Sequence, residues 1–203
     1  MAKVKSIAIV PGYGFGVAQV QDILSDIVNL LHNHGKQIYI CVNSNAGRFP
    51  DYIFNLLDDT NMPKNLIIEL TPSGHNKKSG QYFDFGKLDL VIAVGANDII
   101  NCSVVDPKSP LFNQNQNSKS VSNVWEAKKC VVYKNSLANG YLNIDNPTFC
   151  KNNVFFIFGN IKNNFMELNN LISKEKIEMM DLNDSSHIDI ISRSIDSELE
   201  LVN

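Results

Sequence analysis

Long hydrophobic runs are absent from this sequence, although it is 203 residues long. No apolar stretch approaches the roughly 20 residues that a membrane-spanning helix requires, so we expect no direct membrane insertion by this chain. The N-terminal segment MAKVKSIAIV has two lysines but only a short apolar run. That run is too short for the core of a signal peptide, so we expect no targeting element here.

The sequence also lacks the cysteine and histidine patterns of disulfide-rich and metal-binding proteins. Its four cysteines are widely spaced and form no C-x-x-C pair, which predicts reduced thiols without a disulfide framework. Cys41 and Cys130 fall within predicted strands, where a free cysteine behaves as a small apolar residue. The four histidines complete no set of ligands at metal-binding spacing, so we predict no metal site.

Positive charge is in short supply as well. The formal net charge is -3 at pH 7, the isoelectric point is near 5.8, and the sequence contains no basic stripe. Nucleic-acid-binding proteins usually show such a stripe, so we predict no nucleic-acid partner.

The apolar content is sufficient for a folded domain. With 44% hydrophobic residues, the chain can bury one good core, which favours a single domain. We predict an α/β fold with a Rossmann-like, doubly wound sheet of six parallel strands in a three-layer α/β/α arrangement, in the order 3-2-1-4-5-6. The predicted strands are 6–10, 37–42, 65–70, 88–94, 130–134 and 154–158, and the predicted helices are 17–34, 50–59, 121–127 and 161–178.

The first predicted strand leads into a helix through a glycine-rich turn, in the segment SIAIVPGYGFGVAQVQ. Gly12, Gly14 and Val17 form a G-x-G-x-x-V pattern, in which glycine lets phosphate oxygens approach main-chain N–H groups. The positive end of the following helix would then face a pyrophosphate. The alternative is that these glycines only make a tight turn between strand and helix.

Polar residues follow the second predicted strand. An NAD-binding Rossmann unit has an acidic residue here that binds the ribose 2′-hydroxyl. This sequence has Asn-Ser-Asn at 43–45 instead, which leaves no carboxylate to repel a 2′-phosphate and favours NADP. In Ala46-Gly47-Arg48, the arginine either donates two hydrogen bonds to phosphate or is an exposed residue that caps a loop. Pro50 then opens the next predicted helix.

Gly95-Ala96-Asn97-Asp98 follows the fourth predicted strand. A carboxylate at the tip of a central strand can accept a hydrogen bond from the nicotinamide amide, or it can change protonation and couple cofactor binding to proton movement. Asp98 is a candidate for either role. The alternative is that Asp98 is the N-cap of the turn that follows it.

The fifth predicted strand ends in Lys134-Asn135-Ser136. A lysine ammonium and a serine hydroxyl are suitable donors to a doubly charged 2′-phosphate. The connection 137–149 that follows is long, and loops of this length are usually functional lids or disordered segments.

Six segments match one protein family in the same order. The first is PGYGFGVAQ at residues 11–19, where the family has Pro-Gly-Tyr-Gly-x-x-Val-Ala-Gln. The others are NAGRFP (45–50), VIAVGANDIIN (91–101), VWEAKKCVVYKNS (124–136), GYLNIDNPTF (140–149) and FGNIK (158–162). Over residues 6–172 the chain thus resembles the NADP(H)-binding component, domain III, of proton-translocating NAD(P) transhydrogenase.

The resemblance implies a cofactor, a reaction and two partners. The cofactor is NADP(H), which receives a hydride directly from NADH on a separate NAD(H)-binding component, so no catalytic side chain is implied and Asp98 is a possible coupling residue. A membrane-spanning component couples the reaction to proton translocation, which implies a soluble domain on one face of a membrane. The implied cofactor-binding residues are Gly12, Tyr13, Gly14, Val17, Ala46, Gly47, Arg48, Pro50, Gly95, Ala96, Asn97, Asp98, Lys134, Asn135, Ser136, Gly140, Tyr141, Gly159 and Asn160.

The sequence departs from the family pattern at several points. The family has Lys-Arg-Ser where this chain has Lys134-Asn135-Ser136, which predicts weaker discrimination of NADP from NAD. The family has aspartate at the position of Asn160, so a contact to adenine or ribose is altered there. An acidic segment of the family is also missing at residues 71–75.

Beyond about residue 173 the resemblance ends. We predict a nucleotide-binding domain over 1–173 and an extension or interdomain linker over 174–203. The sequence leaves two other functions open. One is a non-catalytic NADP-binding module for regulation or protein contact, and the other is the cofactor domain of a soluble NADP dehydrogenase, for which the remaining chain is short.

Overall fold

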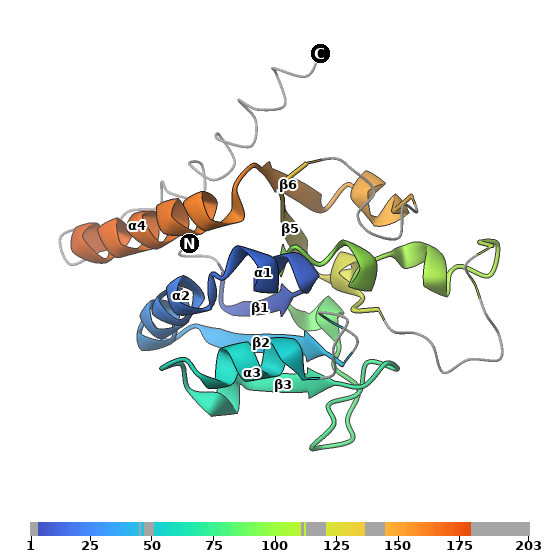
Figure 1. Ribbon diagram of the computed structural model, residues 1–203, viewed down its shortest axis with the longest axis horizontal. Helices are drawn as coiled ribbons and strands as arrows, with labels where there is room; N and C mark the ends of the chain where they lie inside the picture. Colours follow the sequence, from blue (N-terminus) through green and yellow to red (C-terminus); the bar gives the residue numbers. More distant parts are fainter. Residues whose placement is uncertain are drawn as a thin grey trace, which may run out of the picture.

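The computed structural model of this chain describes residues 4–44, 46, 51–110, 112, 121–136 and 145–179, with side chains through 174. Its centre is one sheet of six parallel strands in the order β3-β2-β1-β4-β5-β6 (Figure 1), so the predicted sheet and strand order are confirmed. The strands are β1 (Ser6–Pro11), β2 (Gln37–Asn43), β3 (Ile67–Leu70), β4 (Leu90–Val94), β5 (Lys129–Lys134) and β6 (Val154–Phe158).

β1 lies in the middle of the sheet, between β2 and β4, and is buried at every position. A central parallel strand is covered on both faces, which is why its apolar run is continuous rather than alternating. Cys41 in β2 and Cys130 in β5 are buried, as the sequence predicts. Burial raises the pKa of both thiols, that of Cys130 to about 12, because the thiolate would lose its hydration.

The α-helices lie on one face of the sheet. The ring of Tyr133 in β5 packs edge-on against Phe165 of α4, with 5.0 Å between ring centroids, and α4 lies beside α2. Figure 1 shows α1, α2 and α3 on the near side of β1, β2 and β3. The helices are α1 (Tyr13–Ala18), α2 (Gln21–Asn33), α3 (Tyr52–Asp58) and α4 (Ile161–Met179).

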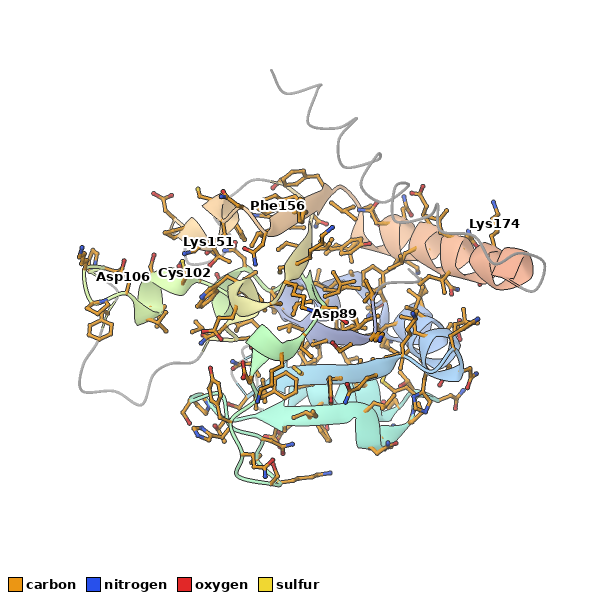
Figure 2. The ribbon with its side chains drawn as sticks, turned by 180° about the vertical axis from the view of Figure 1, so that it is seen from behind. Asp89, Cys102, Asp106, Lys151, Phe156 and Lys174 are labelled. Atoms are coloured by element: carbon orange, nitrogen blue, oxygen red, sulfur yellow. The ribbon has the colours of Figure 1, made fainter. Side chains whose placement is uncertain are left out.

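Within the described residues, 3₁₀ helices and loops cover the opposite face, which Figure 2 shows from behind. The strand register puts Tyr39 and Phe156 on this face, where they pack against Phe83 and Phe149 at 5.3 and 5.1 Å between ring centroids. The outer layer here is therefore built of short turns. The 3₁₀ helices of the described residues are η1 (Lys64–Leu66), which leads from α3 into β3, η2 (Phe85–Lys87), η3 (Asn97–Ile99), η4 (Cys102–Val105), η5 (Val124–Glu126) and η6 (Pro147–Cys150).

The first helix differs from its prediction. Instead of one helix over 17–34, α1 begins at Tyr13 directly after the turn, and the chain breaks at Gln19 before α2 starts. Gln19 has φ 49°, the left-handed conformation, which ends an α-helix. The break reorients the chain, so α1 contacts α3 while α2 packs on β2.

Other boundaries shift by smaller amounts. The predicted helices at 50–59 and 121–127 correspond to α3, which starts at Tyr52, and to the 3₁₀ helix η5. α4, as described over Ile161–Met179, continues past the predicted domain boundary at residue 173. Within the described residues, no helix combines the length and the apolar character needed to span a bilayer.

Candidate functional site

The carboxyl ends of the parallel strands meet at one edge of the sheet. β1 and β4 are neighbours at its centre, yet the chain leaves β1 for α1 on one face and β4 for η3 on the other. This reversal of strand order is the topological switch point, where open α/β sheets bind their ligands. It is also where the sequence places the glycine-containing turns that follow β1 and β4.

These two turns are in direct backbone contact. Gly12 N–H donates to the Val94 carbonyl and Gly14 N–H donates to the Gly95 carbonyl, both at 2.9 Å. A Cβ on Gly14 would lie 2.8 Å from the Gly95 Cα, and one on Gly95 would lie 2.5 Å from the Gly14 Cα. Ala96 contacts Gly12 in the same way, since a Cβ on Gly12 would overlap the Ala96 Cα. The glycines are therefore required by packing between the turns.

This contact gives a different explanation for the G-x-G pattern from the one that the sequence suggested. The sequence suggested that glycine lets phosphate oxygens approach main-chain N–H groups of this turn, but the N–H groups of Gly12 and Gly14 themselves are already hydrogen-bonded to Val94 and Gly95. The contact supports the alternative role of the glycines, a tight turn, and adds a partner for that turn. Their part in nucleotide binding stays a prediction.

α1 presents two large side chains to solvent beside this turn. Tyr13 is 42% exposed and Val17 is 62% exposed, whereas Phe15 between them is fully buried. Gly16, on the inner side, packs under the Tyr52 ring of α3. The outer face of α1 is therefore accessible to a ligand or to another protein.

Asp98 lies in η3 on the other side of the switch point and is half-buried. Asn97 donates from Nδ2 to Asp98 Oδ1 at a long 3.4 Å. The N-cap position of η3 is occupied by Ala96, so Asp98 is not the N-cap that the alternative hypothesis required. Asp98 therefore lies at the carboxyl edge of the sheet, just after β4.

Lys134 ends β5 with its side chain largely covered. The residue is 8% exposed, and its ammonium lies 4.3 Å from the centroid of the Phe149 ring. Burial lowers the pKa of Lys134 from its ordinary value because the charged form loses hydration. Asn135 and Ser136, directly after it, are exposed.

The turn after β6 adjoins the end of β5. Gly159 N–H donates to the Lys134 carbonyl at 3.2 Å, and Gly159 has φ 109°. Asn160 is exposed, and its Oδ1 accepts from the Asn163 N–H at 3.1 Å, which makes it the N-cap of α4. Asn160 thus has a structural role that the sequence comparison with the family did not suggest.

Several predicted site residues lie outside the described part of the chain: Gly47, Arg48, Pro50, Gly140 and Tyr141. Ala46, just before the first group, is buried, and its N–H donates to the Asn43 carbonyl at 2.8 Å. Among the described residues at the end of β2 no carboxylate occurs, since Asn43, Ser44 and Ala46 occupy these positions.

This edge also holds a group of buried polar residues that the sequence did not predict. Asn101, Asn146 and Thr148 are buried and connect η6 to the segment that follows Asp98. In an asparagine-rich sequence nothing marks such residues, although the Asn-Pro-Thr order does match the N-cap and first turn of η6.

A separate hollow lies at the opposite edge. It has a volume of about 540 Å³ and includes Lys36, Tyr39, Lys64 and Lys78 in its lining, where β2 and β3 begin. Lys64 already donates to the carbonyls at the end of α3. This hollow is remote from the switch point and is not part of the candidate site. Within the described residues, no three His, Cys, Asp or Glu side chains gather closely enough to hold a metal ion.

Comparison with known proteins bears directly on this site. The sequence profile of the NAD(P) transhydrogenase beta subunit matches residues 1–171 of the chain. The chain belongs to this family. Two curated relatives, both named NAD(P) transhydrogenase subunit beta and both from Rhodospirillum rubrum, are 30% identical over 163 residues, or 80% of this chain. The matched region is 32% of each relative, so the chain spans about a third of their length.

Membership in the transhydrogenase beta subunit family confirms the resemblance seen in the sequence. The match ends near residue 171, inside α4. All the candidate site residues lie within it.

Proposed function

We propose that this chain is the NADP(H)-binding component of an NAD(P) transhydrogenase, in which NADP(H) exchanges a hydride directly with NAD(H) held on a partner component. The observation that carries the proposal is the switch point between β1 and β4, where open α/β sheets bind their ligands, with Lys134 at the end of the next strand. Family membership supports the choice of reaction.

The side chains at this edge suit a dinucleotide with a 2′-phosphate. The described end of β2 has no carboxylate that would repel this phosphate, and β5 ends in a lysine followed by an exposed serine. Lysine and serine are donors that a phosphate dianion accepts. Arg48 is proposed as a further phosphate donor, and Gly140 and Tyr141 as part of the segment that covers the nucleotide.

NADP(H), when bound, supplies the hydride chemistry. The protein therefore has to bind and orient the nucleotide and to exclude water. Asp98 is proposed to accept a hydrogen bond from the carboxamide of the nucleotide, or to change protonation as the nucleotide binds. The exposed Tyr13 and Val17 on α1 offer a contact surface beside the same edge for the NAD(H)-binding component.

In the intact enzyme we propose that a membrane-spanning component couples this reaction to proton translocation. The chain would then lie on one face of a membrane without entering it. A non-catalytic NADP-binding module is the alternative, and it would bind the nucleotide at the same edge without exchanging a hydride.

Titration of the purified chain with NADPH and NADH tests the cofactor assignment. We expect NADPH to bind more tightly than NADH, and the purified protein to retain NADP(H) that is detectable by fluorescence and by mass spectrometry after denaturation. A preference for NADH would refute the assignment.

Asn135→Arg tests whether the missing family arginine weakens the discrimination of NADP from NAD. A new charge-assisted hydrogen bond is worth about 1.5–3 kcal/mol, which tightens NADPH binding by about ten- to a hundredfold and leaves NADH unchanged. Asn61→Arg, at an exposed position after α3, is the matched control. If Asn135→Arg leaves NADPH affinity unchanged, the missing arginine does not explain the weaker discrimination.

A further inference from the structure

Thr148 joins η6 to the segment that follows Asp98. Its Oγ1 donates to the Ile100 carbonyl at 2.6 Å and accepts from the Cys102 N–H at 2.9 Å. One hydroxyl thus satisfies two backbone groups that lie more than forty residues earlier in the chain. In Figure 2, Cys102 marks η4 and Lys151 directly follows η6, and the two segments are neighbours.

Two asparagines extend this connection on either side. Asn146 donates from Nδ2 to the Asn97 carbonyl, and Asn101 donates from Nδ2 to the Asp145 carbonyl, both at 3.0 Å. The connections therefore run in both directions between the two segments. They reach the backbone immediately before Asp98 as well as after it.

These bonds replace the internal bonds that an α-helix would have made. Residues 97–105 form only the short 3₁₀ helices η3 and η4, so their backbone groups need partners from elsewhere. Thr148 is 0% exposed, and Asn146 and Asn101 are 8% and 7% exposed. A buried carbonyl or N–H that loses its partner is strongly unfavourable, so the cluster has one well-defined arrangement.

We propose that Asn146 and Thr148 are positioning residues for Asp98, which fix its turn against the carboxyl edge and thereby set how slowly NADP(H) dissociates. The inference rests on the proposed function for the identity of the ligand. The positioning itself rests on the hydrogen bonds and the burial of the cluster. Neither residue needs to touch the nucleotide.

Thr148→Val tests this role because valine keeps the shape of threonine and removes the hydroxyl. Thr60→Val is the matched control, since Thr60 is 8% exposed and its Oγ1 donates to the Leu57 carbonyl at 2.6 Å, at the far end of α3. We expect Thr148→Val to accelerate NADPH dissociation about tenfold in stopped-flow fluorescence, because the variant loses both buried hydrogen bonds of the Thr148 hydroxyl. Thr60→Val should stay within about twofold of the wild type. Thr148→Ser, which keeps the hydroxyl, should restore slow dissociation.

Amide hydrogen exchange gives a readout that does not need the nucleotide. Thr148→Val should raise exchange in the segment from Asn97 to Cys102, and Thr60→Val should leave that segment protected. A double variant, Asp98→Asn with Thr148→Val, should release NADPH about as fast as Asp98→Asn alone, because both act through one turn.

Equal NADPH dissociation rates in Thr148→Val and Thr60→Val would overturn the inference. So would a double variant whose acceleration of NADPH dissociation equals the product of the accelerations in Asp98→Asn and Thr148→Val. A wild-type chain that binds no NADPH would overturn the proposed function and, with it, the role in dissociation. Unchanged exchange over residues 97–102 in Thr148→Val would overturn the positioning role by itself.

Discussion

Lys134 brings a positive charge to the carboxyl edge while its side chain is covered by the Phe149 ring. Desolvation lowers the pKa of Lys134, so its ammonium group holds its proton less firmly than that of a surface lysine. A phosphate dianion beside it would favour the protonated form. At the scale of single residues, a substitution of Lys134 is therefore the most direct test of the proposed preference for NADP(H).

Lys134→Met should weaken NADPH binding by about ten- to a hundredfold and leave NADH binding nearly unchanged, because methionine keeps the buried stem but removes the charge. The wild-type affinity for NADPH should also fall as the pH rises through the lowered pKa of Lys134, and this fall should be absent in the variant. Calorimetric titration across alkaline pH measures both effects. Lys129→Met, at the exposed start of the same strand, is the control.

Asp89 is a second residue with a defined electrostatic role, at the opposite edge of the sheet (Figure 2). Its carboxylate accepts from the Lys5 and Ser6 N–H groups at 2.8 and 3.1 Å and pairs with Lys128 at 2.7 Å. These donors hold the pKa of Asp89 well below its usual range, the largest contribution coming from Lys128. The residue therefore ties together the starts of β1, β4 and β5.

Asp89→Asn should lower the free energy of unfolding at pH 7 by about 1.5–3 kcal/mol, the value of charge-assisted hydrogen bonds. Because the pKa is depressed in the folded state, this stabilisation is complete above the ordinary aspartate pKa and is lost as the pH falls toward the lower folded value. Urea unfolding should thus show a difference between wild type and variant that is constant above about pH 5 and shrinks below about pH 4. Asp58→Asn, in an exposed pair with Lys64, should change stability by less than about 1 kcal/mol at any pH.

At the scale of elements, the contact between the turns after β1 and β4 holds the two halves of the sheet in register. Gly95 has φ 54° and no room for a Cβ against Gly14. Gly80 has a similar φ, 70°, but open space around it. Alanine at Gly80 would introduce backbone strain alone, whereas alanine at Gly95 would add steric overlap to that strain.

Gly80→Ala should cost about 1–2 kcal/mol of stability, the strain of the left-handed conformation alone. Gly95→Ala should cost clearly more, because the added methyl group must push the two turns apart, and it should also weaken NADPH binding. Thermal unfolding and NADPH titration of both variants measure this. Equal losses of stability in the two variants would show that the turns do not pack as tightly as described.

Much of this fold could be predicted from sequence, because burial by a parallel sheet leaves continuous apolar runs. β6 has the same bounds as its prediction, and the other strands differ by a few residues. The break at Gln19 could not be predicted, since no glycine or proline marks it and the contact of α1 with α3 decides it. Likewise, the N–H groups of Gly12 and Gly14 are bonded to residues some eighty positions away, which local pattern does not reveal.

The site was predictable in part for the same reason. Strand ends identified Lys134 and Asp98 as residues of one edge, because parallel strands align their carboxyl ends. The connections from Asn146 and Thr148 depend on how η6 packs on η4, which no motif in the chain encodes. Asn160 matched a family position, but its hydrogen bond as the N-cap of α4 emerges only in the fold.

At the scale of the whole molecule, the sheet separates two kinds of surface. The α-helices form one outer layer, and 3₁₀ turns and loops form the other within the described residues. The carboxyl edge between them carries the candidate site, with Tyr13 and Val17 exposed beside it. The chain spans about a third of its curated relatives, so the complete reaction is proposed to need further components.

Hydride exchange with an NAD(H)-binding transhydrogenase component tests the central claim most directly. The chain, loaded with NADP⁺, is mixed with that component and NADH, and the transfer of label from [4-³H]NADH to NADP⁺ is followed. We predict NADPH that carries the label, at a rate that depends on both proteins and falls in Lys134→Met. Confirmed binding of both nucleotides without any transfer of label would contradict the account and leave a nucleotide-binding module without catalytic function.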